Sequence, residues 1–286
     1  MMVRSKNAAL LLSGLLFWGL IHARDQGGVT PLLVKGQSYT APFQAGERLR
    51  YEVNWKPLFM LPAFKAGEIN FEVGESQHEG RSAYTISMDA VSAGRLAEVA
   101  NMEVRNRFES IIDRKSFQSY QILKKTRQSK RKRDMLTVFD YRKNSSWMRE
   151  LDAGSDPPKQ LRNQNIPGIP GPLNDVISAF YAVRLHRLEP GGEYALNLSD
   201  NGRVREMRVL VKKREKVETR IGKFDAVKLE AKGGIFSEGR SLRLWYSRDR
   251  LRIPVKFEAD VKFGTVFGEL IQLEAGSIGR NLIRIK

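Results

Sequence analysis

The sequence predicts a mainly β protein, with a large curved antiparallel sheet or open half-barrel of about ten or more strands packed around one central apolar helix. The clearest strand is Val255–Phe263, where apolar and charged residues alternate strictly, so that one face is dry and the other wet. Glycines at turn positions divide residues 203–273 into an antiparallel meander. A helix expected from Asn174 to about Leu188 is apolar nearly all round, which is typical of a buried helix. Because the remaining segments have the pattern of strands, only a sheet can cover this helix.

Composition narrows the possible functions. The chain has 286 residues, with 49 Lys and Arg against 32 Asp and Glu, a net charge of +17 and no cysteine. The lack of cysteine excludes disulfides, thiolate nucleophiles and Cys-ligated metals. A chain of this length can bury the core of one large β domain or of two smaller ones.

Residues 1–23 have the three parts of a secretory signal peptide. Arg4 and Lys6 are the positive region, Ala8–Ile21 is the apolar region, and Ile21-His22-Ala23 is the cleavage site. The apolar run of about 14 residues is shorter than the roughly 20 that a membrane span needs, although an uncleaved anchor is the alternative. We therefore expect export to the periplasm of a Gram-negative-type bacterium. Removal of the leader leaves 47 basic and 32 acidic residues, a net charge near +15.

After a flexible arm at residues 24–42, an N-terminal β half is expected at 43–155. Its first strand, Leu49–Trp55, alternates apolar and polar side chains, and six further segments have strand character. These segments are residues 69–73, 84–90, 102–112, 117–123, 136–141 and 147–151.

Seven basic residues crowd the expected tip of a long hairpin in this half. A solvated tip that prevents edge aggregation is one interpretation. The other is a contact for an anionic surface, such as lipid head groups or acidic envelope polymers. Nucleic acid would be the first choice for a cytosolic protein, but the leader argues against it. The residues are Lys124, Lys125, Arg127, Lys130, Arg131, Lys132 and Arg133.

A Pro-rich linker loop is expected at residues 156–173, followed by the helix and the C-terminal β-meander at 174–276 and a basic tail at 277–286. Asn174 or Asp175 caps the helix, and Pro190 follows its end. Arg184, His186 and Arg187 lie near the helix C-terminus, where we expect them at the mouth of the sheet. The two β halves are expected to form one continuous domain.

Signatures of catalysis are missing from the sequence. The three histidines have no second ligand at metal spacing, and the usual nucleophile, dinucleotide and P-loop motifs are absent. We predict a non-catalytic protein without cofactor or metal. If the curved sheet leaves space beside the helix, an apolar pocket would form there, whereas in a filled interior the same residues are core. The pocket residues would be Val176, Phe180, Val183, Trp245, Phe257, Val261 and Phe263.

A series of short motifs follows in a fixed order along the chain. The motifs are Phe43-Gln44-Ala45-Gly46-Glu47-Arg48-Leu49-Arg50-Tyr51, Asp175-Val176-Ile177-Ser178-Ala179-Phe180-Tyr181 with Arg184, Gly192, Gly222-Lys223-Phe224-Asp225-Ala226, Leu244-Trp245-Tyr246-Ser247 with Asp249, and Ile253-Pro254-Val255. In this order they resemble an exported bacterial family known as domain of unknown function 3108. The resemblance covers about residues 43–273 and implies a mainly β envelope protein, with no catalytic residues to carry over. The meander is also similar in fold to periplasmic half-barrels that carry lipoproteins.

Three functions remain open from the sequence. The first is a periplasmic protein that binds a lipid or other amphiphile in the half-barrel and contacts an anionic envelope polymer or, peripherally, a membrane through its basic hairpin. The second is a structural or assembly factor of the envelope with a filled core. The third is a hydrolase of envelope polymers. The oligomeric state is not predicted.

Overall fold

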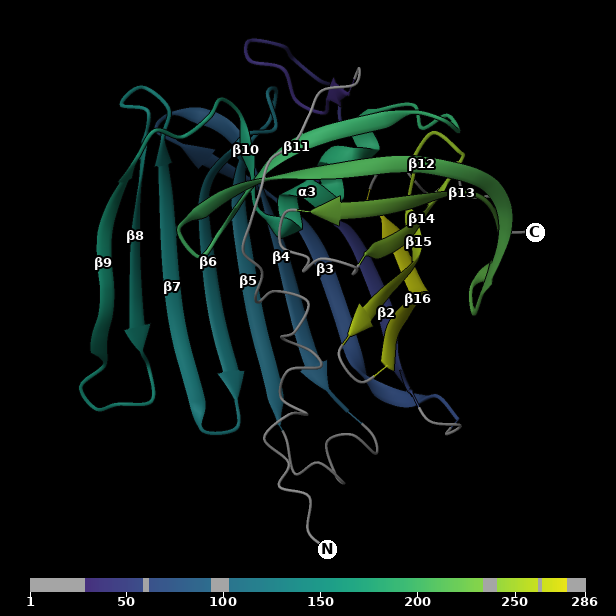
Figure 1. The fold of residues 1–286 in the computed structure, drawn as a ribbon, viewed down its shortest axis with the longest axis horizontal. Coiled ribbons are helices and arrows are strands. Elements are labelled where there is room, and N and C mark those ends of the chain that lie inside the picture. The colour runs from purple at the N-terminus through teal and green to yellow at the C-terminus, as the bar shows by residue number, and fades with distance from the viewer. Residues whose placement is uncertain (1–28, 59–61, 94–102, 234–240, 262–263, 277–286) are drawn as a thin grey trace, which may run out of the picture.

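The structure, a computed structural model, describes residues 29–58, 62–93, 103–233, 241–261 and 264–276. In these ranges it has one sixteen-stranded open sheet and a single short helix, so the predicted mainly β half-barrel around a helix is confirmed (Figure 1). The first nine strands are β1 (Thr30–Pro31), β2 (Glu47–Pro57), β3 (Phe64–His78), β4 (Arg81–Ser92), β5 (Val104–Asp113), β6 (Ser119–Gln128), β7 (Arg131–Asp140), β8 (Ser145–Asp152) and β9 (Lys159–Pro167). The others are β10 (Leu173–Asn174), β11 (Glu193–Asp200), β12 (Arg203–Thr219), β13 (Gly222–Gly233), β14 (Leu242–Ser247), β15 (Pro254–Val261) and β16 (Gly264–Ala275).

The sheet joins both halves of the chain. Its order is β1-β11-β12-β13-β14-β15-β16-β2-β3-β4-β5-β6-β7-β8-β9, and β10 also pairs with β11. Only β1 and β10 pair in parallel within this sheet, and the other described pairs are antiparallel. Because β16 pairs with β2, the C-terminal meander continues directly into the N-terminal strands.

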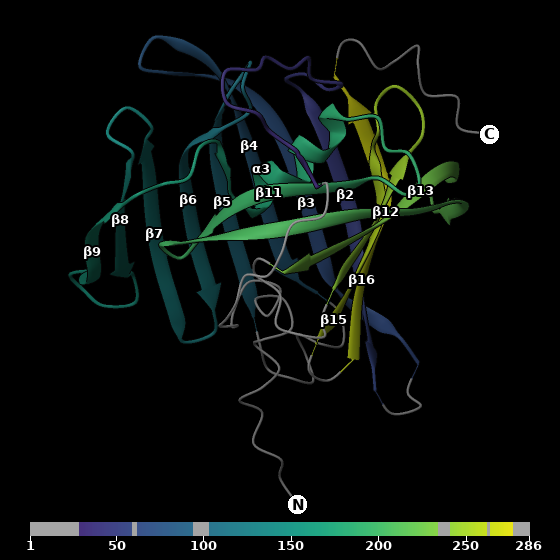
Figure 2. The same cartoon turned by 45° about the horizontal axis from the view of Figure 1, so that its top comes forward.

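The sheet is strongly curved. In Figures 1 and 2, β11 to β13 cross one side of the helix while β3 to β5 lie on its other side. The pairing register shifts after Val211, Trp245, Leu270 and Val53. Such bulges bend a strand and increase its twist, which lets one sheet wrap around a helix. The side of the sheet that faces the helix is called the concave face below.

The helix is shorter than predicted. The α-helix α3 spans Val176–Ala182, and a 3-10 turn, η2, continues over Val183–Leu185. Asp175 caps α3 as expected, accepting bonds from the backbone amides of Ile177 and Ser178. The helical conformation ends at His186, which is extended, and the Arg252 side chain donates to the Arg184 carbonyl at this end.

Two predicted loops contain structure. The segment 156–173 was expected to be a linker, but it holds β9 and the start of β10. Strand β9 lies at an edge of the sheet with most residues exposed, so it has no apolar alternation to reveal it. The expected flexible arm includes β1, and Leu32 is fully buried in the core. The signal peptide, the basic tail and Phe263 lie outside the described residues.

Candidate functional site

An aromatic cluster marks where the helix meets the concave face. The ring of Phe180 stacks on Phe71, with 5.1 Å between centroids and 10° between planes. Tyr51 contacts Phe71 edge-on at 5.9 Å and also lies 5.7 Å from Phe257. Tyr246 donates its hydroxyl hydrogen bond to the Phe180 carbonyl at 2.9 Å, which anchors the helix to β14.

Phe180 differs from its neighbours in burial. Tyr181 and Ile177 are buried, whereas Phe180 on the same short helix is only partly buried. Phe180 packs against the buried core cluster without being fully covered by it. The helix therefore directs Tyr181 into the packed core and leaves part of the Phe180 ring accessible.

A row of paired residues continues this apolar surface across the other side of the sheet. Trp55, Val266, Ala259 and Leu242 are successive cross-strand partners, and Phe64 follows beside Trp55. Phe64, Trp55 and Leu242 remain partly exposed. The indole Nε1 of Trp55 is buried and has no hydrogen-bond partner in the described part of the chain. The concave face thus carries apolar groups that the protein covers incompletely.

The predicted pocket residues fall into different places. Phe257 and Val261 lie on the concave face, and Phe257 is linked to Phe180 by the ring contacts of the aromatic cluster. The Phe257 ring fills the space beside Gly268. Val176 is partly buried at the start of α3, and Val183 is buried in the core.

Trp245 does not belong with this group. Its neighbour Leu244 pairs with Phe257, whereas Trp245 pairs with Lys256 and therefore lies on the convex face. There Lys228 and Lys256 lie 4.9 and 5.2 Å above its ring, and its indole N–H donates to Glu215. The placement of Trp245 in the apolar pocket was wrong, because the long lysine side chains bury it from the outside.

Two buried polar contacts position the helix. The Asp175 carboxylate accepts hydrogen bonds from Ser119 at 2.9 Å and Ser178 at 3.0 Å, and from Ser110. At the other end Arg184 is fully buried against Glu47, rather than at the mouth as predicted. The capping residue was readable from the sequence, but its hydroxyl partners on β5 and β6 were not.

The interior has the electrostatics of an apolar compartment. Burial raises the pKa of Tyr51 and of Tyr181 well above the usual 10.0, and burial likewise raises the pKa of Tyr246. Loss of the hydroxyl proton would give a charged phenolate, which desolvation disfavours. These hydroxyl groups therefore stay neutral around the helix, and the charges in this part of the interior are those of the Arg184–Glu47 pair and Asp175.

The basic hairpin exists, but its charges divide between two faces. Strands β6 and β7 are joined through Ser129 and Lys130. Lys124 lies on the concave face beside Phe108, and it is buried in an ion pair with Asp200. Arg131 and Arg133 share this face by register, whereas Lys125, Arg127 and Lys132 project from the convex face. The predicted anionic contact is therefore not one continuous patch.

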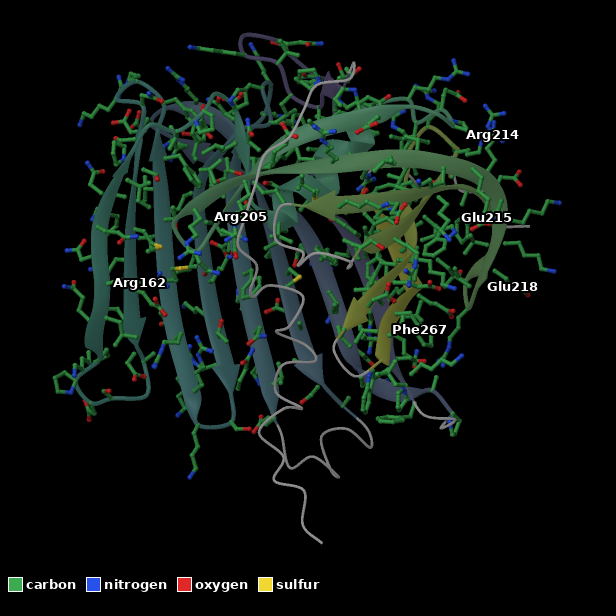
Figure 3. The ribbon with its side chains drawn as sticks, in the orientation of Figure 1. Arg162, Arg205, Arg214, Glu215, Glu218 and Phe267 are labelled. Carbon is green, nitrogen blue, oxygen red and sulfur yellow. The ribbon has the colours of Figure 1, made fainter. Side chains whose placement is uncertain are left out.

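A shallow hollow of about 600 Å³ lies outside the sheet near the lower ends of β15 and β16. Phe267, labelled in Figure 3, lines it together with Lys56 and Pro62. Arg243 at its rim pairs with Asp260 at 2.7 Å, and Lys256 pairs with Glu258 at 3.0 Å. These charges already satisfy one another, which favours a solvated surface over a site with free binding groups.

Metal and membrane features are not found in the described ranges. No group of three His, Asp or Glu side chains there could hold a metal ion. No helix in these ranges is long and apolar enough to pass through a bilayer.

Two solved structures are similar to this chain at low sequence identity. The structure of a β-barrel-like protein of domain of unknown function DUF1849 from Brucella abortus has a TM-score of 0.54 at 15% identity, covering 80% of this chain and 97% of that chain. A protein with a YmcC-like fold from Bacteroides fragilis has a TM-score of 0.33 at 10% identity, covering 83% and 99%.

No curated protein matches the chain in sequence, and the likenesses indicate no catalytic activity. The Brucella likeness concerns the fold alone. The sequence pattern of the family described as protein of unknown function (DUF3108) matches residues 50–271, most of the chain. The protein therefore belongs to the DUF3108 family, as its motifs indicated.

Proposed function

We propose that this protein is a non-catalytic envelope protein that binds the apolar chain of a lipid or other amphiphile against the concave face of its half-barrel. The observation that carries this proposal is the partly exposed ring of Phe180, stacked on Phe71 inside the curve of the sheet. An incompletely covered aromatic in such a position is available to an apolar ligand.

The neighbouring side chains support the same function. Met88 is the cross-strand partner of Phe71 and is also partly exposed. Across the curve, Trp55 and Leu242 offer further apolar surface. A ligand chain lying between these two surfaces would remove apolar area from water, at about 25 cal/mol per Å². The proposed location in the envelope rests on the leader at residues 1–23.

Titration of the mature protein with a fluorescent fatty-acid probe tests the proposal. We expect saturable binding that an unlabelled fatty acid reverses, and a weaker response in Phe180→Ala. Native mass spectrometry of protein isolated from its own envelope should show a bound amphiphile. Absence of both saturable binding and a co-isolated ligand would overturn the carrier function in favour of a structural role.

A further inference from the structure

One row of successive cross-strand partners crosses the concave face, and its side chains change from apolar to charged along the row. It begins at Phe71, on which Phe180 stacks, and proceeds by direct cross-strand pairing from β3 to β9. Its members are Phe71, Met88, Phe108, Lys124, Met135, Glu150 and Arg162. Three strand spacings separate Phe71 from Lys124, which is about 14 Å. A line of apolar side chains, most of them buried, therefore leads directly to fixed charges.

The adjacent rows show that the charge is confined to one end. One step toward the β6–β7 turn, the row is Ile69, Ala90, Asn106, Thr126, Arg133 and Asp152. One step away from that turn, the row is Val73, Ile86, Ser110, Ile122, Thr137 and Met148, all of which are uncharged. Figures 1 and 2 place α3 toward the end of the sheet opposite the β6–β7 turn. The charged groups thus lie beyond the helix, where the concave face continues past it.

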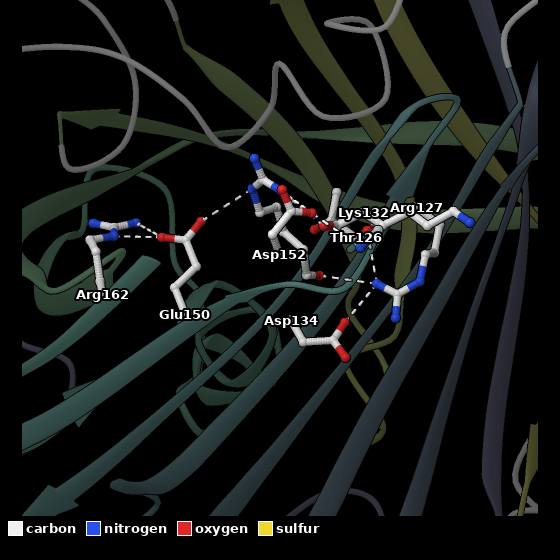
Figure 4. Close-up of polar contacts among 9 residues, drawn as sticks. Thr126, Arg127, Lys132, Asp134, Glu150, Asp152 and Arg162 are labelled. Atoms are coloured by element: carbon white, nitrogen blue, oxygen red, sulfur yellow. Dashed lines mark hydrogen bonds and ion pairs between the residues drawn. The ribbon is translucent and has the colours of Figure 1, made fainter. Parts of the chain in front are cut away.

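The cations are held in defined positions. Arg133 lies 2.5 Å from Asp152 and 4.0 Å from Glu150, and the Nε of Arg162 donates to Glu150 at 2.5 Å (Figure 4). The Nζ of Lys124 lies 5.7 Å from the centre of the Phe108 ring. Guanidinium groups fixed in this way keep further N–H donors for a second acceptor. The ion pairs with Asp152 and Glu150 therefore hold Arg133 and Arg162 in place without using all of their N–H donors.

The charge balance of this end favours an anion. Lys124, Arg131, Arg133, Lys159 and Arg162 carry five positive charges on these rows, and Glu150, Asp152 and the Lys124 partner Asp200 carry three negative charges, a net +2. Arg203, the cross-strand partner of Asp200, and Arg205 lie on the same face of β12 as Met207 by register, and Figure 3 shows Arg205 in front of the back strands. These two residues bring the balance to +4.

A buried amide is a second, independent observation. Gln128 is the cross-strand partner of Arg131 at the end of β6 and is only 6% exposed. Its Nε2 is buried with no hydrogen-bond partner in the described ranges. A buried donor without an acceptor costs free energy, so a ligand that brings an acceptor there would recover it.

We propose that the ligand is an anionic amphiphile, with its carboxylate or phosphate head at Gln128, Arg131 and Arg133 and its chain extending past Phe108 toward Phe180. This inference rests on the proposed function and adds the charge and the orientation of the ligand. The cations attract the head group, while the apolar end of the row excludes water from the chain.

Three probes of equal chain length test the charge: a fluorescent fatty acid, the corresponding lysophosphatidate and the corresponding fatty alcohol. We expect at least one of the two anions to bind about tenfold more tightly than the alcohol. The anion that binds more tightly identifies the head group as a carboxylate or a phosphate. Arg133→Gln should remove most of this preference and leave alcohol binding unchanged, while Arg133→Lys should restore part of it.

Lys132→Gln is the matched control, because Lys132 directly precedes Arg133 on β7 but projects from the convex face. It removes the same charge and should leave all three affinities unchanged. Gln128→Met removes the amide without a change of charge, and it should weaken binding of the anions only. This variant also keeps the inference testable if Arg133→Gln does not fold.

The outcomes separate the two proposals. Equal affinity of the wild type for anions and alcohol would overturn the head-group site while leaving the carrier function in place. Equal losses from Lys132→Gln and Arg133→Gln would overturn the site as well, because they would indicate only a general effect of charge. Failure of all three probes to bind the wild type would instead contradict the proposed function itself.

Discussion

Arg184 and Glu47 form a doubly hydrogen-bonded ion pair in the interior, with Nη1–Oε1 and Nη2–Oε2 distances of 2.6 and 2.8 Å. Their side chains are 0% and 1% exposed. Arg184 also donates to the Leu251 carbonyl at 3.1 and 3.0 Å, and its guanidinium lies 4.9 Å from the Phe43 ring. The pair joins the end of the helix to the first long strand and to the turn before β15.

Removal of one partner of this pair should strongly destabilise the protein. Glu47→Gln leaves Arg184 charged and buried without its counter-ion, which we expect to lower the free energy of unfolding by about 3–5 kcal/mol. Urea unfolding measures this change. Arg48→Ala on the next residue breaks only exposed pairs, and it should cost at most about 1 kcal/mol. A comparable loss in both variants would mean that burial of the pair is unimportant.

The β11–β12 turn should be sensitive to a single added methyl group. A Cβ at Gly202 would lie 2.9 Å from Nε2 of Gln164 and 3.1 Å from the side chains of Met148 and Ile166. Gly80 has nearly the same φ, +75° against +76°, but has open space around it.

We expect Gly80→Ala to cost about 1–2 kcal/mol from the left-handed backbone. Gly202→Ala should cost about 1 kcal/mol more, the low end of overpacking, because the contacting side-chain ends can move. Parallel thermal unfolding of the two variants isolates the packing contribution. Equal costs would show that the turn does not press against β8 and β9.

Phe180 distinguishes a carrier from a filled core. Because its ring is partly exposed, Phe180→Ala should cost only about 1–2 kcal/mol, below the roughly 3–5 kcal/mol of a fully buried phenylalanine. Phe117→Ala is the control, since Phe117 is fully buried. Urea unfolding of both variants, with fatty-acid probe binding alongside, provides the comparison. A loss as large as that of Phe117→Ala, with no probe binding by any form, would favour the structural role.

His186 should make folding weaken in mild acid. Its Nε2 lies 2.6 Å from the Leu32 carbonyl oxygen, between the rings of Tyr39 and Tyr194. Burial lowers the pKa of His186 below its usual 6.5, and this effect, together with the nearby Arg252, outweighs the hydrogen bond with the Leu32 carbonyl, which raises the pKa. Below pH 6.5 the unfolded chain therefore gains a proton that the folded protein resists. The contribution of the neutral His186 ring to the free energy of unfolding is therefore complete above pH 6.5. It is lost as the pH falls toward the pKa that His186 has in the folded protein.

The measurement is the stability difference between wild type and His186→Gln from about pH 8 to about pH 5.5. Gln can still donate to the Leu32 carbonyl but does not titrate. We expect the free energies of unfolding of wild type and variant to differ by a constant amount above neutrality. Below the usual histidine pKa the wild type should lose stability relative to the variant. A difference independent of pH over this range would rule out His186 as the cause.

The convex side of the hairpin should bind anionic membranes weakly. Lys125, Lys130 and Lys132 are exposed, and each cation near such a surface contributes about 1 kcal/mol. Replacement of all three by Ser should reduce sedimentation with anionic liposomes, with little change in thermal stability. Salt should weaken binding of the wild type to anionic liposomes, and the wild type should not sediment with uncharged liposomes.

Arg133→Gln, on the concave face, is the control for this experiment and should leave sedimentation unchanged. Equal sedimentation of the triple variant and the wild type would make the exposed lysines irrelevant to membrane contact.

Local patterns predicted the elements that have a clear period or a clear cap. Val255 to Val261 alternates in burial because apolar and charged residues alternate, and the strand follows directly. Asp175 just before an apolar run predicted the helix start, because its carboxylate can bond the first free amides. By contrast, β9 was missed because an exposed edge strand needs no apolar face.

Faces and distant partners were decided only by the fold. Leu244, Trp245 and Tyr246 are all apolar or aromatic, so alternation could not show that Leu244 faces Phe257 and Trp245 faces outward. In the hairpin, charges at successive positions likewise concealed which ones lie on the concave face. Glu47 and Arg184 are 137 residues apart, and only the wrapping of the sheet brings them together. The period of a strand defines two faces, but the curvature of the whole sheet determines which face becomes the interior.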